Sequence, residues 1–215
     1  SGLGLVRRPA QAQGHGAQEQ DTQEPLAARG ARLARGDPGS SRGRASRAAP
    51  TSPSTSALGW QDEYRGKGVG RGKVVLADGT VFEGEFRDGV RHGFGEMVWP
   101  DGDVYEGQWK DGKMHGKGRY AYADSGTYSG EFEADLRHGN GKYEYADGTS
   151  YEGEYQRGQY HGKGKYTFAD GDVMITGFEA DRPVGQGVVW SADWAQAWEL
   201  QDGKQGRSIS LEEAQ

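Results

Sequence analysis

Apolar and polar residues alternate along the chain after residue 58, and the alternation recurs every 23 residues. One position of this period holds an aromatic or apolar residue in five consecutive units: Phe82, Tyr105, Tyr128, Tyr151 and Met174. A second aromatic position lies four residues later, at Phe86, Trp109, Phe132, Tyr155 and Phe178. Five units of one length indicate a repeat architecture, with boundaries at about 82–104, 105–127, 128–150, 151–173 and 174–196.

Each unit has the pattern of two short strands. In the unit 105–127, Tyr105, Gly107 and Trp109 occupy alternate positions, so a strand would place all three on one face. A polar break and a second alternating stretch follow. Asp-Gly pairs in the breaks are typical of hairpin turns, and the frequent glycines exclude a helix. The sequence therefore predicts an all-β fold, an elongated antiparallel meander that forms a solenoid-like ribbon of 23-residue β-hairpin repeats.

The two faces of this ribbon are expected to differ. The face that carries the aromatic residues also carries glycines, which leave room for rings to lie flat over the backbone. The other face is charged, with glutamates on the first strand of a unit and lysines on the second. Opposite charges on neighbouring strands contribute about 0.2–1 kcal/mol per pair. A single unit cannot fold alone, so neighbouring units must stabilise one another.

The units at the two ends depart from the pattern, as capping units do. Residues 70–76 match a second strand whose partner strand is not recognisable. At the other end, Trp190, Trp194 and Trp198 have the spacing of a helix face, but residues 198–204 also resemble the start of a further unit. We favour a strand there.

Composition divides the chain into three parts. Residues 1–58 lack Phe, Tyr and Trp and carry eight Arg against four acidic residues, a net charge of +4. Such a segment cannot bury enough surface to fold, so we expect a disordered basic low-complexity tail, which is either a leader for an organelle or a functional arm. The repeat domain is expected over 59–204. Residues 205–215 form a tail or a short helix, because Ser210–Glu213 resembles a capping box.

The rest of the composition excludes several kinds of site and partner. No stretch is long and apolar enough for a transmembrane helix, and the absence of cysteine excludes disulfides, thiolate zinc sites and a cysteine nucleophile. Residues 59–215 carry a net charge of −10. Nucleic acid is therefore not an expected partner, because its phosphates would be repelled.

The repeated pattern resembles the MORN repeat family (membrane occupation and recognition nexus). The family unit is Tyr-x-Gly-x-aromatic, a short loop, His-Gly-x-Gly with a following aromatic residue, and an Asp-Gly turn. Residues 105–127 match it at nearly every position, with Asp124-Ser125-Gly126 in place of the usual Asp-Gly, and the resemblance extends over about 66–204. It implies a twisted ribbon of hairpins with a grooved aromatic surface.

The resemblance implies little about activity. Family members include membrane tethers, radial-spoke proteins of cilia, phosphoinositide kinases and a histone methyltransferase, and in the enzymes catalysis lies in a separate domain. No such domain is recognisable here. From the resemblance we expect an intracellular protein, cytoplasmic or in a ciliary or cytoskeletal assembly, although organelle targeting stays open.

Three patterns suggest chemistry and are better explained as structure. The histidines at 92, 115, 138 and 161 recur once per unit, about 9.6 Å apart, which is too far for adjacent units to share one zinc ion. The Asp-Gly pairs are ordinary turns and lack the spacing of a calcium loop. The glycine-rich residues 66–72 lack the spacing of a phosphate-binding loop. We therefore expect no catalytic residue, no metal, no cofactor and no enzyme activity.

Two functions of different classes remain. The first is a protein-interaction scaffold whose exposed aromatic groove docks a partner such as an amphipathic helix. Its expected contact residues are Phe86, Tyr105, Trp109, Tyr128, Phe132, Tyr151 and Tyr155. The alternative for these rings is a place in the core. The second function is attachment to anionic membrane phospholipid, which the lysines favour and the net charge of −10 opposes. The open edges of such a ribbon also permit a homodimer.

Overall fold

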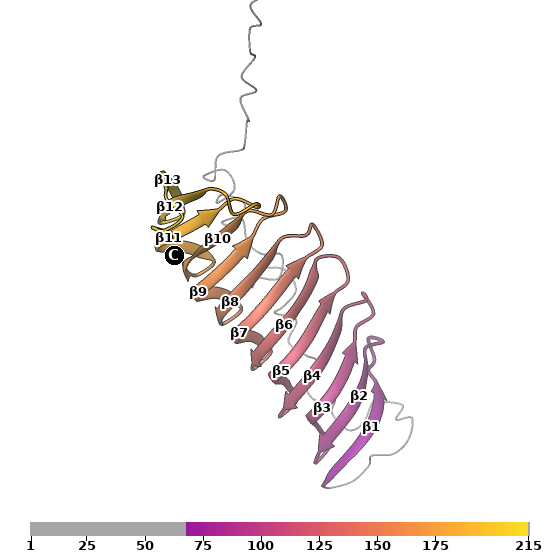
Figure 1. Cartoon of the computed structure of the whole chain (residues 1–215). Helices are drawn as coiled ribbons and strands as arrows, with labels where there is room; N and C mark the ends of the chain where they lie inside the picture. Colours follow the sequence, from indigo (N-terminus) through magenta and orange to yellow (C-terminus); the bar gives the residue numbers. More distant parts are fainter. Residues whose placement is uncertain (1–67, 215) are drawn as a thin grey trace, which may run out of the picture.

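The computed structural model describes residues 68–214. The tail expected over residues 1–58, and the first residues of the expected repeat domain, lie outside this range. The described residues form a single sheet of 13 strands (Figure 1). The strands are β1 (Val69–Val75), β2 (Val81–Arg87), β3 (Val90–Val98), β4 (Val104–Lys110), β5 (Lys113–Tyr122), β6 (Gly126–Glu133), β7 (Leu136–Tyr145), β8 (Ser150–Gln156), β9 (Gln159–Thr167), β10 (Val173–Glu179), β11 (Arg182–Trp190), β12 (Ala197–Gln201) and β13 (Lys204–Ile209).

The order of the strands confirms the predicted all-β meander. Each strand pairs antiparallel with its neighbours in the sequence, from β1 at one end of the ribbon to β13 at the other (Figure 1). Each repeat unit supplies two strands, such as β4 and β5 from the unit 105–127. Residues 68–214 contain no helix, and so none in that range could span a membrane.

Two kinds of turn join the strands. Inside a unit, both central turn residues have positive φ, as in Asp111 (52°) and Gly112 (81°). This is the type I′ hairpin turn, whose twist matches that of the flanking strands. Between units, the aspartate accepts a hydrogen bond from the backbone two residues later, as Asp147 does from the N–H of Thr149 at 2.9 Å. The Asp-Gly pairs thus build both edges of the ribbon.

The His-Gly step of each unit forms a β-bulge, which the sequence analysis did not foresee. In the unit 105–127, the register between β4 and β5 shifts between Gly107 and Trp109. The bulge glycine, Gly116, has a φ of 58°, and a Cβ there would overlap the side chain of Gln108. Only glycine fits such a position without strain. The first glycine of His-Gly-x-Gly is therefore explained by the bend of the strand.

The C-terminal end is built of strands. Trp198 lies in β12, as the sequence favoured, and β13 follows where a tail or short helix was expected. The capping-box hydrogen bonds do form: Ser210 N–H donates to Glu213 Oε2 at 2.9 Å, and Glu213 N–H donates to Ser210 Oγ at 3.3 Å. They close a turn, however, and no helix follows within the described residues.

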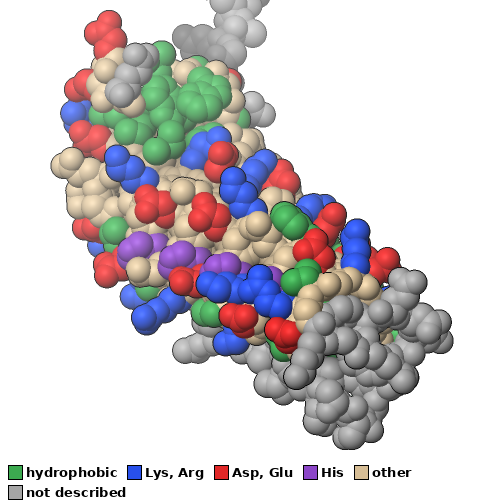
Figure 2. Space-filling view, turned by 90° about the horizontal axis from the view of Figure 1, so that it is seen from below, with side chains coloured by type: hydrophobic (Ala, Val, Ile, Leu, Met, Phe, Trp, Pro, Cys, Tyr) green, Lys and Arg blue, Asp and Glu red, His purple; other side chains and the backbone are tan. Residues whose placement is uncertain are grey.

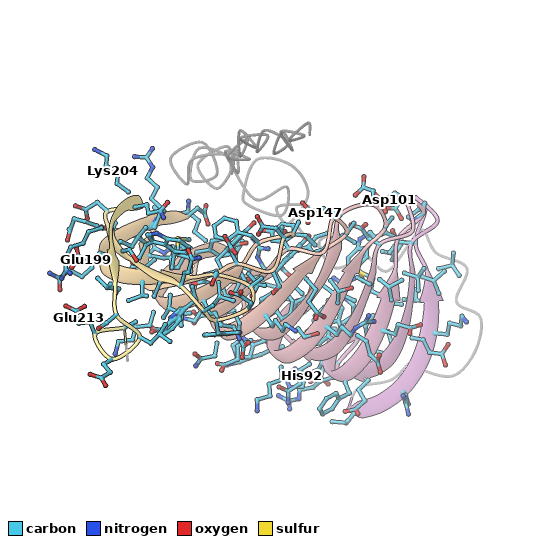
Figure 3. The ribbon with its side chains drawn as sticks, turned by 45° about the horizontal axis from the view of Figure 1, so that its top comes forward. His92, Asp101, Asp147, Glu199, Lys204 and Glu213 are labelled. Carbon is cyan, nitrogen blue, oxygen red and sulfur yellow. The ribbon has the colours of Figure 1, made fainter. Side chains whose placement is uncertain are left out.

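The two faces of the sheet differ as expected. We call the aromatic side the inner face and the charged side the outer face. On the outer face, Lys73 pairs with Glu83 at 3.1 Å, and Lys165 pairs with Glu152 at 3.5 Å. The turns between units add a row of aspartates along one edge, where Asp101 and Asp147 lie, apart from His92 (Figure 3).

Candidate functional site

Nine aromatic rings form a continuous zigzag through the inner face, which we call the ring spine. Every contact in it is edge-to-face, with ring centroids 5.0–5.3 Å apart. Tyr105, for example, contacts Trp109 of its own unit and Phe132 of the next. Edge-to-face pairs contribute about 0.5–1.5 kcal/mol beyond the burial of area, so the spine couples the units. Its members are, in order, Phe86, Phe82, Trp109, Tyr105, Phe132, Tyr128, Tyr155, Tyr151 and Phe178.

All seven residues expected to bind a partner belong to the ring spine. The structure brings them together, but it does not expose them. Their exposed fractions are 3% for Phe86, 0% for Tyr105, 2% for Trp109, 0% for Tyr128, 4% for Phe132, 0% for Tyr151 and 2% for Tyr155. The expectation that these rings stand exposed is wrong, because each packs against rings of its own unit and the next. Their role in binding a partner stays a prediction.

Glycines beneath the rings make this packing close. The ring of Tyr105 lies over Gly107 of its own strand and Gly118 of β5, where a Cβ would come within 2.5 Å of the tyrosine hydroxyl. Tyr128 and Tyr151 lie over the equivalent glycines of their units. The expectation that rings lie flat over glycine backbone is therefore confirmed.

Two buried arginines contact the spine. The guanidinium of Arg137 lies 5.3 Å from the ring centroid of Tyr155 and donates a hydrogen bond to the backbone oxygen of Gly158 at 2.6 Å. Arg91 lies 5.0 Å from the ring of Trp109 and donates to the backbone oxygen of Gly112 at 2.8 Å. Burial lowers the pKa of Arg91 to about 10, although Asp135 acts in the opposite direction.

Both arginines escaped the sequence analysis. They occupy the same position of the period as Met114 and Tyr160, which are also buried. Strand alternation from the bulge glycine places this position on the inner face. This alternation was the signal that could have identified the two arginines as core residues.

More accessible aromatic surface lies beside the spine at two side chains, whereas Trp99, Tyr122 and Phe168, which are equivalent to the first of them, are buried. Tyr145, at the end of β7, is half-buried. Its ring lies 4.3 Å from that of Tyr143, and its hydroxyl contacts the hydroxyl of Tyr160. Trp198 on β12 is likewise half-buried and packs against the core. These two side chains leave some aromatic surface accessible beside the buried spine.

The histidines form a row along the outer face (Figure 2). His92 Nδ1 lies 3.8 Å from Asp111, and His138 Nδ1 lies 3.5 Å from Glu133, near the turns inside the units. Across residues 68–214, no group of three His, Cys, Asp or Glu side chains is arranged to hold a metal ion. His92 and His138 thus lie near acidic residues of the hairpin turns, and a structural role for the four histidines stays a prediction.

The comparison with protein families agrees with this geometry. The model of the MORN repeat matches residues 82–104, 105–127, 128–150 and 151–173. The chain therefore carries four consecutive MORN repeats. These boundaries coincide with units derived from the 23-residue period. In each matched MORN repeat, the segment that corresponds to Tyr-x-Gly-x-aromatic supplies two rings of the spine. The His-Gly-x-Gly segment supplies the bulge and the glycine beneath a ring.

The MORN ribbon continues beyond the four matched repeats. The unit 174–196 keeps the hairpin of β10 and β11 and the register shift, here between Thr176 and Gly177. Its Phe178 ends the ring spine. The β12–β13 hairpin follows, so the structural repeat is longer than the part that the family model recognises.

Other comparisons add little. No curated protein matches the chain. Among solved structures, one similar chain is the SAS-4 (dCPAP) TCP domain of Drosophila melanogaster, in complex with a proline-rich motif of Ana2 (dSTIL). It is 12% identical, the alignment covers 66% of this chain and 84% of that chain, and the TM-score is 0.38. A likeness of this size supports no argument about partners.

Proposed function

We propose that this MORN ribbon is a non-catalytic scaffold that docks a partner protein along its inner face. The observation that carries the proposal is a continuous aromatic face from β2 to β12 whose rings are mostly buried, with Tyr145 and Trp198 left half-buried at its surface. These residue types dominate the binding energy of protein interfaces. An amphipathic helix is the partner that suits an elongated aromatic face.

The burial of the ring spine changes how such docking works. The seven residues Phe86, Tyr105, Trp109, Tyr128, Phe132, Tyr151 and Tyr155 are buried and hold the shape of the inner face. Contact with the partner falls first on Tyr145 and Trp198, which are only half-buried. Substitution of a spine residue would lower stability as well as binding, so it cannot test docking by itself.

A matched pair of variants separates the two faces. Tyr145→Arg places a charge on the inner face, and Thr167→Arg places the same charge at a half-buried position of the outer face, on β9. The full chain and both variants would serve as bait in a cell lysate, after circular dichroism shows that all three are folded. We expect one discrete protein to be captured by the wild type and by Thr167→Arg, and lost with Tyr145→Arg.

The same experiment decides between protein and lipid. Vesicles with anionic phospholipid are added in a parallel arm at low salt, where attraction between charges is strongest. Equal capture of protein by both variants would move the docking site away from the inner face. Binding of vesicles without capture of any protein would make anionic lipid the ligand. The ciliary or cytoskeletal setting rests on the family resemblance and is tested by imaging the tagged full chain in ciliated cells.

A further inference from the structure

One row of side chains crosses the outer face at right angles to the strands, and we call it the outer row. Each member lies directly opposite the next in the strand register. Neighbouring strands are about 4.8 Å apart, so adjacent members are close enough to interact. From β1 to β8 the row reads Lys73, Glu83, Glu96, Glu106, Arg119, Ser129, Lys142 and Glu152.

The charges of the outer row are only partly paired within one chain: Lys73 lies 3.1 Å from Glu83, Lys142 lies 2.6 Å from Glu144, and Glu152 lies 3.5 Å from Lys165. Glu83, Glu96 and Glu106 lie on three adjacent strands, and like charges placed directly opposite each other are destabilising. In this row, the first strand carries glutamate in the first, second and fourth units. The first strand of the third unit carries Ser129, which lies between Arg119 and Lys142. Among residues 68–214, no ion pair within 4.0 Å involves Glu96, Glu106 or Arg119.

The order of charges along the outer row is, however, complementary to the same order read in the opposite direction. A two-fold axis parallel to the strands, midway between β4 and β5, would place the outer faces of two copies against each other with β4 over β5. Glu106 then opposes Arg119 of the second copy, and Glu83 opposes Lys142. Towards the ends of the row, Lys73 opposes Glu152, and Glu96 opposes the hydroxyl of Ser129. No position brings two like charges together.

An apolar row runs beside the outer row, two residues after it on β1, β3 and β5 and two residues before it on the antiparallel strands β2 and β4. Its members on β1 to β5 are Val75, Val81, Val98, Val104 and Ala121. Val75 is 40% exposed, and the other four are half-buried. Under the same two-fold axis, Val104 meets Ala121 of the second copy, next to Val98 and Thr127, while further from the axis Val81 meets Glu144 and Val75 meets Ser150. An apolar strip at the axis with charges beside it is the usual anatomy of an interface.

We propose that the outer face over β1–β8 is a homodimer interface, with the occupant a second copy of this chain related by that axis. Sheets that pack face to face keep their strands within about 30° of each other, and this axis produces such an aligned pair. The two rows offer 13 residues per copy, fewer than the roughly 20–30 of a standard interface, so the dimer is weak and salt-sensitive. This inference does not depend on the proposed function, because the inner faces of both copies stay accessible.

Charge reversal tests the pairing directly. One variant carries Glu83→Lys and Glu106→Lys, and the other carries Arg119→Glu and Lys142→Glu. By sedimentation velocity with the full chain at low salt, we expect wild type to dimerise and each variant alone to dimerise about tenfold or more weakly. An equimolar mixture of the two variants restores opposite charges at both pairs of contacts, so it should form a heterodimer. A control with Lys163→Glu and Glu179→Lys, on β9 and β10, should dimerise like wild type.

Other outcomes would overturn the proposal. About 1 M salt reduces the Debye length to about 3 Å, and the wild-type dimer should weaken there. A wild-type chain that stays monomeric at low salt contradicts the interface. So does a dimer that survives both charge reversals, which would point to the open edges at β1 or β13. Thermal melts of each variant show whether a loss of dimer reflects loss of fold, and failure of the mixture to associate would also reject the axis.

Discussion

The hydroxyl of Tyr128 donates a hydrogen bond to the backbone oxygen of Glu131 at 2.9 Å. The oxygen belongs to the strand opposite the bulge, at the point where the register shifts. Equivalent bonds join Tyr105 to Gln108 at 2.8 Å and Tyr151 to Glu154 at 3.0 Å. Burial raises the pKa of Tyr128 well above its usual value, so the phenol keeps its proton and remains a donor. This bond explains why the first aromatic position is tyrosine in three repeats.

Removal of that hydroxyl tests its contribution. Tyr128→Phe keeps the ring in the spine and removes one hydrogen bond, which should lower the free energy of unfolding by about 1 kcal/mol. Tyr128→Ala also removes the ring and should cost about 3–5 kcal/mol. Urea denaturation of the full chain measures both. Equal losses for the two variants would show that the ring contacts contribute nothing beyond the hydroxyl.

The ring of Tyr128 requires glycine beneath it at position 141. A Cβ on Gly141 would overlap this ring, and all three of its nearest atoms belong to Tyr128. Gly141→Ala should therefore destabilise the ribbon by about 1–3 kcal/mol. In the Tyr128→Ala background, the same substitution should cost at least about 1 kcal/mol less, because the clashing atoms are gone. Additive effects in this double-mutant cycle would contradict the contact.

Two turns inside units lack glycine and are expected to be strained. Ala134 has a φ of 50° and Ala180 a φ of 49°, and this left-handed region costs a non-glycine residue about 1–2 kcal/mol. Ala134→Gly removes the strain but adds freedom to the unfolded chain. We therefore expect a net gain of about 0.5–1 kcal/mol. Ala146→Gly, at a turn residue without positive φ, is the control and should destabilise; a loss in both variants would reject the argument.

Asp135 gives a prediction for pH. Its Oδ1 accepts a hydrogen bond from the N–H of Met114 at 2.9 Å, and burial raises its pKa above the usual 3.8. The folded chain then holds a proton that the unfolded chain has lost, so this carboxyl destabilises the fold as pH rises from about 3.8 through the raised pKa.

Asp135→Asn removes that titration and keeps an oxygen that can accept the same bond. Its free energy of unfolding, relative to wild type, should increase with pH in this window and level off above it. Urea melts at a series of pH values measure the difference. A constant difference, or one that falls with pH, would show that Asp135 is not destabilised by burial.

The fold followed closely from the sequence because a strand has a side-chain period of two and each unit has a fixed length. Those two periods set which residues share a face, and the observed register agrees, as with Glu106 opposite Arg119. The candidate site was predicted less well from the sequence than the fold was. Alternation assigns Tyr105 and Trp109 to one face, but it does not say how tightly rings of successive units interlock.

Other features could not be predicted because they depend on local backbone geometry. The bulge at Gly116 interrupts the side-chain alternation of the strand by a single residue. Assigning residues to the two faces of the sheet does not require such a bulge. Ala134-Asp135 has no glycine, so its type I′ turn could be inferred only from its place in the repeat. The hydrogen bonds of Ser210 with Glu213 were foreseen, yet a capping box alone does not provide enough following residues for a stable helix.

Site-specific photo-crosslinking tests the central claim, that the partner docks on the inner face, most directly. A photoreactive residue would replace Tyr145 on the inner face of β7 or Lys163 on the outer face of β9, in otherwise unchanged full chain. The account predicts that one protein is crosslinked through position 145 and that the same protein is absent from crosslinks through position 163. Crosslinking of that protein through position 163 alone would contradict docking on the inner face.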